Sequence, residues 1–510
     1  MARAKLLMVQ GTASNVGKSV LVAALCRIFR QEGWNVAPFK AQNMSLNSFV
    51  TRDGGEMGRA QVVQAEAACV EPTVEMNPIL LKPEADNRSQ VIVRGKPVST
   101  QSAREYYSHK ANLWEIVRQS LESLIARYEM VVIEGAGSPS EINLRDNDLV
   151  NMRVARYCQS PVILVADIDR GGAFASVVGT LEILESEERA LVKAIVLNKF
   201  RGDISLLDSG ITWLENKTGI PVAGVIPYYH DIHLADEDSV ALEEKCQAEG
   251  KNYLIDVAVI HFPHLSNFDD FDPIRQEENV RLRFIDDKKA LENPDLIILP
   301  GTKTTIADLE HIRRIGIADR LLELAKQGVP VIGICGGYQM LGESISDPHQ
   351  VESSKAKVPG LGLLPVATSF LTTKSTHQVK GHVIGNDGLL KGTSGLPIAG
   401  YQIHMGQTVE ADTGAAFRIE EQSRTPCRDT DGFQARDGNV LGTYIHGLFH
   451  NRGLRRAILT GLAARKGISL HFGEDVLSKE AQYDCLADLV RNSLDMNLLY
   501  RIAGLNKHTA

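Results

Sequence analysis

A glycine-rich loop that follows an apolar run constrains this chain more than any other feature. Residues 11–19 read Gly-Thr-Ala-Ser-Asn-Val-Gly-Lys-Ser, after the apolar run 5–10 and before a helix-like segment. In that context backbone N–H groups and a helix N-terminus form a cradle for phosphate. The loop is one residue longer than the common pattern G-x-x-x-x-G-K-[ST]. The sequence therefore predicts a strand, a phosphate loop and a helix in that order.

The residue types in this loop match the chemistry of a bound nucleoside triphosphate. Lys18 would reach the β- and γ-phosphates, and the Ser19 hydroxyl would hold Mg²⁺. The alternative interpretation is a glycine-rich turn that only packs. The candidate nucleotide-binding residues of the loop are Gly11, Thr12, Asn15, Val16, Gly17, Lys18 and Ser19.

Short apolar runs alternate with helix-like segments through the first half of the chain. The runs 5–10, 35–39, 130–134, 161–166, 194–198 and 221–226 read as buried parallel strands. Segments 19–31 and 103–128 between them are amphipathic. This alternation predicts an α/β fold with an open parallel sheet, whose chemistry lies at the carboxyl ends of the strands.

A second α/β unit is expected after an acidic stretch that ends near residue 251. The runs 253–260, 296–299 and 330–334 resemble strands followed by helices, 366–444 is strand-like, and the tail from 452 looks helical. At about 150 residues per domain, 510 residues suggest several domains. We expect one domain at 1–250, another at 251–450 and a helical tail at 451–510.

Composition excludes several classes of protein. Hydrophobic residues are 44%, charged residues 23%, and the formal charge is −8, which argues against nucleic-acid binding by bulk charge. The seven cysteines are dispersed and include no Cys-x-x-Cys, as in a reducing compartment. Because no apolar run reaches the ~18 residues of a membrane span and the N-terminal run reads as a strand, not a signal peptide, we expect a cytoplasmic protein that does not contact membranes.

Two further strand ends carry chemistry. Glu134, in Ile-Glu-Gly-Ala-Gly, ends a buried run where a carboxylate binds Mg²⁺ or orients a nucleophile. Cys335, in Gly-Ile-Cys-Gly-Gly-Tyr-Gln, lies between a strand and a helix, where flanking glycines permit a sharp turn and the helix N-terminus favours a thiolate. The alternatives are a solvated loop and a buried structural cysteine.

A nucleophilic cysteine needs a base and an oxyanion site. Among the 14 histidines, His446 is the best placed, at the end of a late strand before a glycine, and His404 is second. Backbone N–H groups of 299–304, after another strand, are candidates for the oxyanion site.

Together these motifs resemble the glutamine-hydrolysing corrin amidases. In that family a dethiobiotin-synthetase-like ATPase precedes a class I glutamine amidotransferase domain. The resemblance runs from about residue 5 to about 450 and includes KAQNMSLN (40–47), GGEMGRAQ (54–61), MNPILLKP (76–83), NKFRGD (198–203) and SNFDDFD (266–272).

The resemblance implies ATP- and glutamine-dependent amidation, with Mg²⁺, of a corrin ring. In the branch that these motifs resemble, the substrate is adenosylcobyrinic acid a,c-diamide, whose b, d, e and g carboxylates become amides through acyl phosphates. The partners are then small molecules, and a homo-oligomer is left open. Cys335 would form the glutamyl thioester and His446 would be its base.

The resemblance also assigns five further residues. Glu134 and Glu56 would bind Mg²⁺, Lys40 would steady the phosphoryl group, Asn198 would contact the nucleobase, and Asp146 would meet a corrin carboxylate. Most class I amidotransferases have an acid two residues after the catalytic histidine. Here that position is Leu448, so a Cys–His dyad is expected and nothing in the sequence explains how His446 is oriented.

Two other functions fit parts of the pattern. A sister enzyme performs the same chemistry on the a and c carboxylates of the corrin. A regulatory ATPase of the partitioning type could carry an inactive amidotransferase-like domain, although the intact Cys335 and His446 speak against it.

Overall fold

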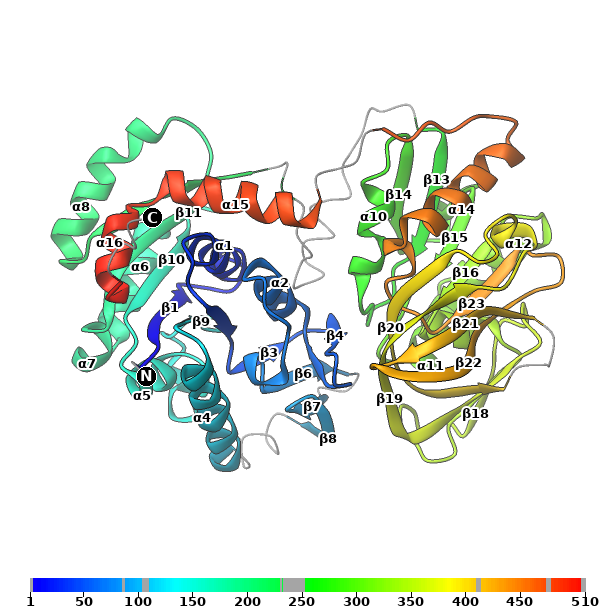
Figure 1. Ribbon diagram of the computed structural model, residues 1–510, viewed down its shortest axis with the longest axis horizontal. Coiled ribbons are helices and arrows are strands. Elements are labelled where there is room, and N and C mark those ends of the chain that lie inside the picture. Colours follow the sequence, from blue (N-terminus) through cyan, green and yellow to red (C-terminus); the bar gives the residue numbers. More distant parts are fainter. Residues whose placement is uncertain are drawn as a thin grey trace.

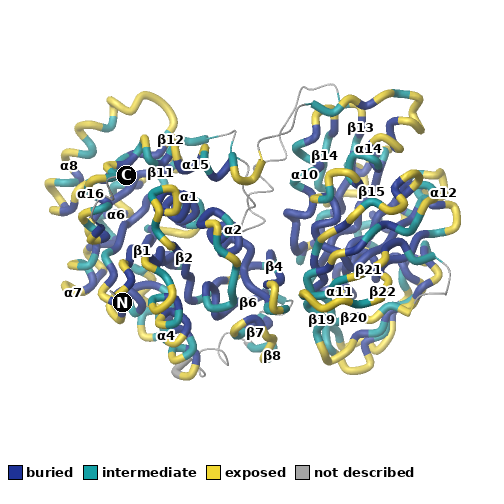
Figure 2. The backbone as a smooth tube through the Cα atoms, in the orientation of Figure 1, coloured by how far each residue is buried: buried dark blue, intermediate teal, exposed yellow. Residues whose placement is uncertain are grey.

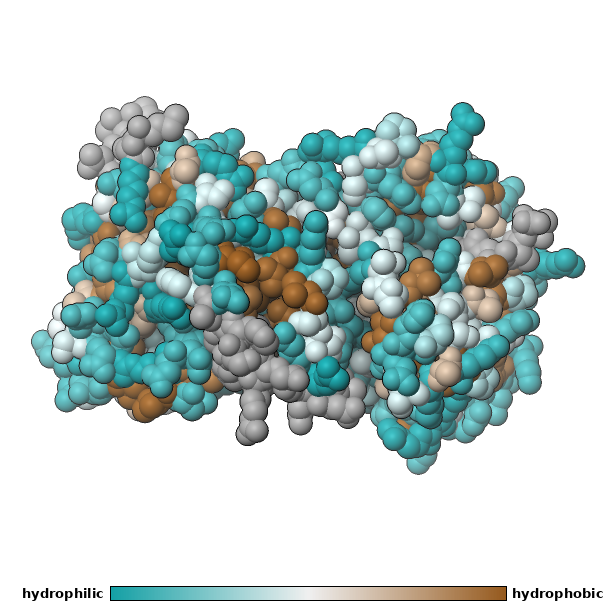
Figure 3. Space-filling view, turned by 90° about the horizontal axis from the view of Figure 1, so that it is seen from below, coloured by the Kyte–Doolittle hydropathy of each residue, from teal (hydrophilic) through white to brown (hydrophobic). Residues whose placement is uncertain are grey.

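The chain forms two lobes in the computed structural model (Figure 1). The structure describes residues 3–84, 88–102, 110–229, 232, 253–409, 414–473 and 478–505. The expected domain boundary near residue 250 lies outside these residues. Among the helices of the described residues, none is long and apolar enough to cross a bilayer. Seen from below, the surface is largely hydrophilic, with an apolar area near its middle (Figure 3).

A six-stranded sheet of parallel strands forms the centre of the first lobe. Its strand order is β12-β11-β10-β1-β9-β2, and neighbouring strands pair in parallel. The bounds are β1 (Lys5–Gly11), β2 (Val36–Phe39), β9 (Met130–Glu134), β10 (Val162–Asp167), β11 (Val192–Phe200) and β12 (Val222–Pro227). The six predicted strands are therefore confirmed to within about two residues at each end.

Helices cover both faces of this sheet, and the first lobe also contains two separate small sheets. The helices are α1 (Lys18–Gln31), α2 (Arg59–Ala67), α4 (Lys110–Arg127), α5 (Met152–Cys158), α6 (Ala173–Ile183), α7 (Ser186–Arg189) and α8 (Asp208–Thr218), with 3₁₀ turns η1 (Val74–Met76), η2 (Ile142–Asn147) and η3 (Ile204–Leu207). The small sheets contain β3 (Gln42–Met44), β6 (Ile79–Pro83), β7 (Arg88–Val93) and β8 (Lys96–Ser102), and β4 (Ser48–Val50) with β5 (Glu56–Gly58). The expected helix 103–128 is α4 in its described part, and 103–109 lie outside the described residues.

The second lobe contains an 11-stranded mixed sheet of order β14-β13-β15-β16-β23-β22-β21-β19-β17-β18, with β20 paired to β19. The parallel part is β13 (Ile255–Ile260), β14 (Val280–Ile285), β15 (Leu296–Leu299), β16 (Val331–Ile334) and β23 (Val440–Thr443). The rest is β17 (Ser344–Ser346), β18 (Lys357–Pro359), β19 (Ala367–Val383), β20 (Pro397–Val409), β21 (Ala415–Gln422) and β22 (Thr425–Gln434). Its helices are α10 (Asp272–Arg275), α11 (Thr305–Arg314), α12 (Ile317–Lys326), α13 (Gly336–Leu341) and α14 (Arg452–Arg465), with 3₁₀ turns η4 (Phe268–Phe271), η5 (Lys289–Leu291), η6 (Gly388–Leu390) and η7 (Leu448–His450).

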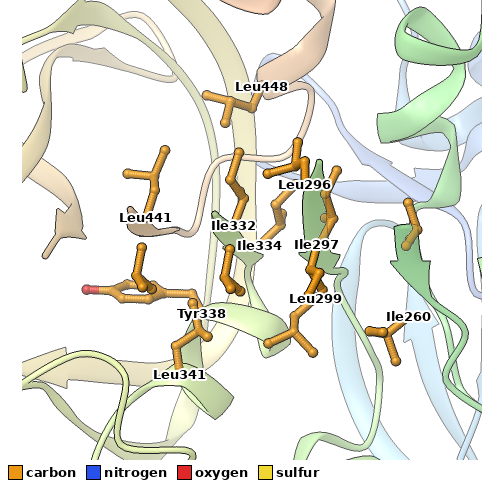
Figure 4. Packing of buried hydrophobic residues seen from close by; sticks show 14 of the residues in the cluster. Ile260, Leu296, Ile297, Leu299, Ile332, Ile334, Tyr338, Leu341, Leu441 and Leu448 are labelled. Carbon is orange, nitrogen blue, oxygen red and sulfur yellow. The ribbon is translucent and has the colours of Figure 1, made fainter. Parts of the chain in front are cut away.

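Each lobe has its own apolar core. The strands of both sheets are buried and the exposed backbone lies at the periphery (Figure 2). In the second lobe β15 and β16 contribute side chains that pack with Leu441 and Leu448 (Figure 4). Buried apolar side chains on both faces explain the continuous Val, Ile and Leu runs of the parallel strands. The predicted α/β fold class is confirmed.

The last two helices return to the first lobe. α15 (Lys479–Ser493) and α16 (Met496–Ala503) lie beside α1 and the edge strand β12 (Figure 1). Their apolar residues, including Tyr483, Leu486 and Leu499, belong to the core cluster of β1 and α1, whereas α14 packs in the core of the second lobe. The chain therefore passes between the two lobes twice, once from the first to the second and once back.

The lobes meet along a segment of the first lobe that begins at Asn47. The backbone N–H of Ser48 donates to Asn267 Oδ1 at 3.1 Å, and that of Phe268 donates to Asn47 Oδ1 at 3.3 Å. Buried Arg59 pairs with Asp269 at 3.0 Å. These contacts hold the segment of η4 against the first lobe.

Candidate active site

The phosphate loop connects β1 to α1 at the carboxyl edge of the first sheet. The Thr12 N–H donates to Val165 O at 2.9 Å. Asn15 and Gly17 have φ of 59° and 95°, in the left-handed region. A Cβ on Gly17 would lie 2.1 Å from Asn198 Nδ2, so only glycine fits there. The strand, the loop and the helix therefore follow one another in the predicted order.

Lys18 and Asn198 hold this loop closed. Lys18 Nζ donates to Ala13 O at 2.9 Å and to Gly137 O at 3.1 Å. Asn198 Nδ2 donates to Val16 O at 2.8 Å. The ammonium of Lys18 thus lies between two strand ends, where a β- or γ-phosphate would be bound. Asn198 contacts the loop backbone, a role the sequence did not indicate.

Glu134 lies at the carboxyl edge of the first sheet and accepts hydrogen bonds from several segments. It is fully buried at the end of β9. Its Oε1 accepts from Ser19 Oγ at 2.8 Å and from Lys40 Nζ at 2.8 Å. Its Oε2 accepts from Gln64 Nε2 at 2.5 Å, and Gln61 Nε2 lies 3.5 Å away. The Ser19 hydroxyl beside a carboxylate supplies the oxygen ligands that Mg²⁺ prefers, and Lys40 Nζ places a positive charge on the same oxygen.

Glu56 has different partners. Its Oε1 accepts from Lys82 Nζ at 2.9 Å and from Ser48 Oγ at 2.9 Å, and its Oε2 from Lys374 Nζ of the second lobe at 2.5 Å. Burial opposes ionisation of this carboxyl, but the two ammonium groups lower its pKa well below the usual range. The structure therefore brings Glu56 to a buried ion-pair cluster rather than to Ser19 and Glu134, and these contacts favour a structural role.

Asp146 lies on η2 and lines a large cavity of the first lobe. This cavity has a volume of about 910 Å³ and includes Gly137, whose carbonyl accepts from Lys18. The cavity therefore adjoins the phosphate loop. Its lining combines apolar groups with three arginines, among them Leu81, Val91, Trp114, Arg145, Arg153 and Arg156.

Cys335 lies at a strained turn between β16 and α13. Its φ of 52° and ψ of −108° are unusual for a residue with a side chain. Its N–H donates to Thr443 O at 2.8 Å. A Cβ on Gly337 would lie 1.9 Å from Leu299 O, so the helix after the turn packs against β15 at a distance only glycine permits. These features make the sharp elbow that the flanking glycines predict.

The loop after β15 runs beside this elbow. Gly337 N donates to Pro300 O at 3.0 Å. A Cβ on Gly301 would meet His446 Cε1 at 2.8 Å, and one on Gly336 would lie 3.2 Å from Thr302 N. The backbone of 300–302 therefore lies between the base and the nucleophile helix, and it is part of the stretch 299–304 predicted to supply oxyanion donors.

His446 is buried and held by an acid from another part of the chain. Its Nδ1 lies 2.7 Å from Asp270 Oδ2, and the Gly447 N–H donates to Asp270 Oδ1 at 2.6 Å. Leu448, at the position where an acid is common, is a fully buried core residue (Figure 4). The carboxylate that orients the histidine thus comes from η4, 176 positions earlier.

The surroundings of His446 favour its charged form. Burial disfavours the imidazolium, but the charge and hydrogen bond of Asp270 and the hydrogen bond to Cys335 outweigh it and raise the pKa of His446 to about 10. Tyr401 stacks on the imidazole with ring centroids 5.3 Å apart. An imidazolium beside Cys335 is the partner that stabilises a thiolate.

His404, the second candidate for the base, has other contacts. Its ring stacks on Tyr444 with centroids 3.8 Å apart, and its Nδ1 lies 2.7 Å from Gly406 O. Burial, as the largest cause, lowers the pKa of His404 to about 4. These contacts favour a neutral, packed histidine.

Asp270 is the residue that sequence reasoning missed. It lies in SNFDDFD, which was quoted for its resemblance only. The signal was an acidic doublet, Asp269–Asp270, between the aromatic residues Phe268 and Phe271. A carboxylate buried there needs a charged partner, and the structure supplies His446.

Two family models match successive parts of the chain. Residues 7–241 match the model of the CobQ/CobB/MinD/ParA nucleotide binding domain, and residues 256–454 match the CobB/CobQ-like glutamine amidotransferase domain. A solved glutamine amidotransferase aligns with 41% of this chain and 98% of its own at 17% identity and a TM-score of 0.30.

Curated relatives match along almost the whole chain. A protein named cobyric acid synthase from Dehalococcoides mccartyi strain CBDB1 is 50% identical over 98% of this chain and 99% of its own. Proteins of the same name from Desulfitobacterium hafniense DCB-2 and Sorangium cellulosum are 51% and 50% identical over 98% of this chain. With that identity over that length, this chain belongs to the cobyric acid synthase family, whose members are glutamine-using amidoligases.

Proposed function

We propose that this protein uses ATP and glutamine to convert the b, d, e and g carboxylates of adenosylcobyrinic acid a,c-diamide into amides, giving adenosylcobyric acid. The observation that carries the proposal is that a phosphate loop with Glu134 and a Cys335–His446–Asp270 site occur in one chain. A carboxylate is a poor electrophile until its oxygen becomes a leaving group, and ammonium is no nucleophile. One site would activate the carboxylate with ATP, and the other would release ammonia from glutamine.

We assign the glutaminase reaction to residues 251–450. The Cys335 thiolate attacks the side-chain carbonyl of glutamine, and the imidazolium of His446 gives its proton to the departing ammonia. A glutamyl thioester remains, which water cleaves to glutamate with His446 as the base. Asp270 keeps the imidazole ring oriented through Nδ1. The N–H groups of Gly301 and Thr302 would donate to the oxyanion.

We assign ATP-dependent activation to residues 1–250. A corrin carboxylate oxygen attacks the γ-phosphorus of ATP, ADP leaves, and an acyl phosphate forms. Ammonia then attacks the acyl carbon and phosphate leaves, so the amide forms with one ATP consumed per carboxylate. Lys18 and the loop N–H groups bind the phosphates, and Lys40 steadies the transferred group.

The residues around Glu134 fit a magnesium ion. The Ser19 hydroxyl and the Glu134 carboxylate are hard oxygen donors within 2.8 Å of one another. Mg²⁺ bound there would neutralise charge on the β- and γ-phosphates during transfer. Lys40 contacts the same carboxylate oxygen, so this chain's own residues already concentrate positive charge at that point.

The cavity at η2 is the proposed corrinoid site. Its volume of about 910 Å³ lies in the upper range of small-molecule sites. Arginines suit the carboxylates of a corrin ring, and Trp114 and the apolar wall suit the macrocycle. Arg153 is stacked over Trp114 at 4.3 Å, which places a cation against an aromatic face inside this cavity. Asp146, at the same cavity, would meet the ring near the carboxylate that reacts.

Mass spectrometry of the corrinoid tests the proposal. The protein is incubated with ATP, Mg²⁺, glutamine and adenosylcobyrinic acid a,c-diamide, and the product is fragmented. We expect a ladder of four acid-to-amide steps that disappears without ATP. Acceptance of cobyrinic acid instead would move the protein to the a,c-diamide reaction. ATP hydrolysis without any corrinoid change would favour a regulatory ATPase.

A further inference from the structure

Helix α2 contacts both candidate sites. Its first residue, Arg59, is buried and pairs with Asp269 at 3.0 Å, next to the Asp270 that holds His446. Its Gln61 and Gln64 direct their side-chain amides at Glu134 Oε2. The helix has nine residues, about 13 Å of rigid rod. A single element thus connects the glutaminase acid to the nucleotide carboxylate.

At the glutaminase end of α2, the cation of Arg59 faces two buried carboxylates. Asp269 and Asp270 are adjacent, and both are almost fully buried. Burial and the charge of Asp270 raise the pKa of Asp269, while Arg59 opposes this. Two neighbouring carboxylates stay ionised in a buried site only if each has a cation. Arg59 serves Asp269 in this way and leaves Asp270 to serve His446.

The same arginine also touches the wall of the glutaminase site. Its guanidinium lies 5.2 Å from the centroid of Phe49. Phe49 packs on Tyr401 with centroids 5.1 Å apart, and Tyr401 stacks on His446. A shift of Arg59 therefore reaches the imidazole by two routes, through the acidic doublet and through stacked rings.

The other end of α2 contacts the two groups that are proposed to hold Mg²⁺. Gln64 Nε2 donates to Glu134 Oε2 and lies 3.3 Å from Ser19 O. Ser19 and Glu134 are the groups proposed to hold Mg²⁺. If Glu134 turned its oxygens to the ion, the amides of Gln61 and Gln64 would lose the carboxylate as an acceptor. Because α2 is a single short helix, we expect a displacement at this end to reach Arg59.

We propose that α2 transmits occupancy of the nucleotide site to the glutaminase site, with Arg59 as a positioning residue that acts on His446 through Asp269 and Asp270. The inference rests on the proposed function, because it assumes that both sites are active. Its consequence is that glutamine is hydrolysed fastest when nucleotide is bound. By linkage, glutamine must change nucleotide affinity by the same factor that nucleotide changes glutamine affinity.

The test measures this coupling in Arg59→Met without any corrinoid. Glutamate release is followed with and without adenylyl imidodiphosphate and Mg²⁺. In the wild type we expect the nucleotide to raise kcat/KM for glutamine about 10-fold, and in Arg59→Met by less than about twofold. Affinity for the same analogue is measured by calorimetry in a Cys335→Ser background. Glutamine should change the dissociation constant there and should no longer do so once Arg59→Met is added.

Matched variants separate coupling from folding. Arg424→Met removes another ion pair between the lobes, the exposed contact of Arg424 with Glu71 at 3.2 Å, and should keep the wild-type stimulation. Arg59→Lys keeps the charge and should restore part of it. Gln64→Leu acts from the other end of α2 and should lose stimulation even if Arg59→Met fails to fold.

The outcomes decide between the inference and the proposed function. Wild-type stimulation in both Arg59→Met and Gln64→Leu, or none in the wild type, overturns the inference. Coupling that depends on Arg59 supports it, even if the corrinoid test fails. A wild-type chain that releases no glutamate under any condition contradicts both.

Discussion

The nucleotide site and the glutaminase site of this chain are built in different ways. Most of the phosphate cradle comes from one stretch, residues 11–19, whose turn is made by its own sequence. The glutaminase site joins Cys335, His446 and Asp270 from three separate segments, and His446 and Asp270 lie 176 positions apart. A site made from one loop survives loss of distant contacts, whereas a site made from three segments depends on the packing that brings them together.

The largest expected effect is at the nucleophile of the glutaminase site. Cys335→Ser should lower glutamine hydrolysis by about 10⁵-fold, because no other group forms the thioester. Amidation should continue when an ammonium salt replaces glutamine, since the nucleotide site does not use Cys335. Glutamate release and corrinoid amidation are measured side by side. Loss of ammonium-driven amidation would contradict the separation of the two sites.

Asp270→Asn should lower glutaminase kcat by about 10³-fold. An amide in place of the carboxylate can donate a hydrogen bond to Nδ1 and so favour the wrong tautomer of the imidazole. The matched change is Asp269→Asn, which alters the neighbour that does not touch the ring and should cost less. Equal, small effects of the two substitutions would show that the carboxylate of Asp270 does not orient His446.

The same variant predicts a change with pH. The charge of Asp270 helps to raise the pKa of His446 to about 10, so its removal lowers that pKa and moves the alkaline limb of the glutaminase profile to lower pH. A folded pKa above the ordinary 6.5 also adds stability that is full below pH 6.5 and lost as pH rises toward about 10. Thermal unfolding at several pH values should show this loss in the wild type and less of it in Asp270→Asn.

A smaller effect is expected at the nucleotide site. Lys18→Met should lower ATP-dependent amidation by about 10²-fold with either nitrogen source, because one cationic donor to the phosphates is lost. Glutamate release in the absence of nucleotide should stay near the wild-type rate. An amidation rate like that of the wild type would mean that Lys18 does not bind the transferred phosphate.

The smallest predicted effect is at Asn198. Its amide donates to Val16 O, and loss of one such hydrogen bond costs about 1 kcal/mol. Asn198→Ala should therefore raise KM for ATP about fivefold and, if its main role is to hold the loop, raise KM for GTP equally. A change in the preference for ATP over GTP would instead support contact with the nucleobase.

Local patterns predicted the fold well. The predicted run 5–10 corresponds to β1 (Lys5–Gly11), and 194–198 lies within β11 (Val192–Phe200). Such strands can be recognised because a parallel strand buried on both faces needs a continuous run of apolar side chains. The return of α15 to the first lobe had no comparable signal. The apolar stripe of α15 indicates that this helix packs against an apolar core. It does not indicate whether that core belongs to the first or the second lobe.

The same distinction applies to the site. Gly17 and Lys18 could be proposed from the sequence because they are neighbours in a single turn. Asp270 was not, because its partner is on another strand end and no spacing rule relates them. Glu56 matched a motif, but its ion-pair partners Lys82 and Lys374 come from distant segments, so its surroundings could not be read from residues 54–61.

The most direct test of the two-site account follows the nitrogen atom. The protein is given ATP, Mg²⁺, adenosylcobyrinic acid a,c-diamide and glutamine labelled with ¹⁵N at the side-chain amide, and the corrinoid is analysed by mass spectrometry. We predict ¹⁵N in each new amide for the wild type and no ¹⁵N in any corrinoid amide for Cys335→Ser. Labelled amides in Cys335→Ser, or an unchanged corrinoid in the wild type, would contradict the account.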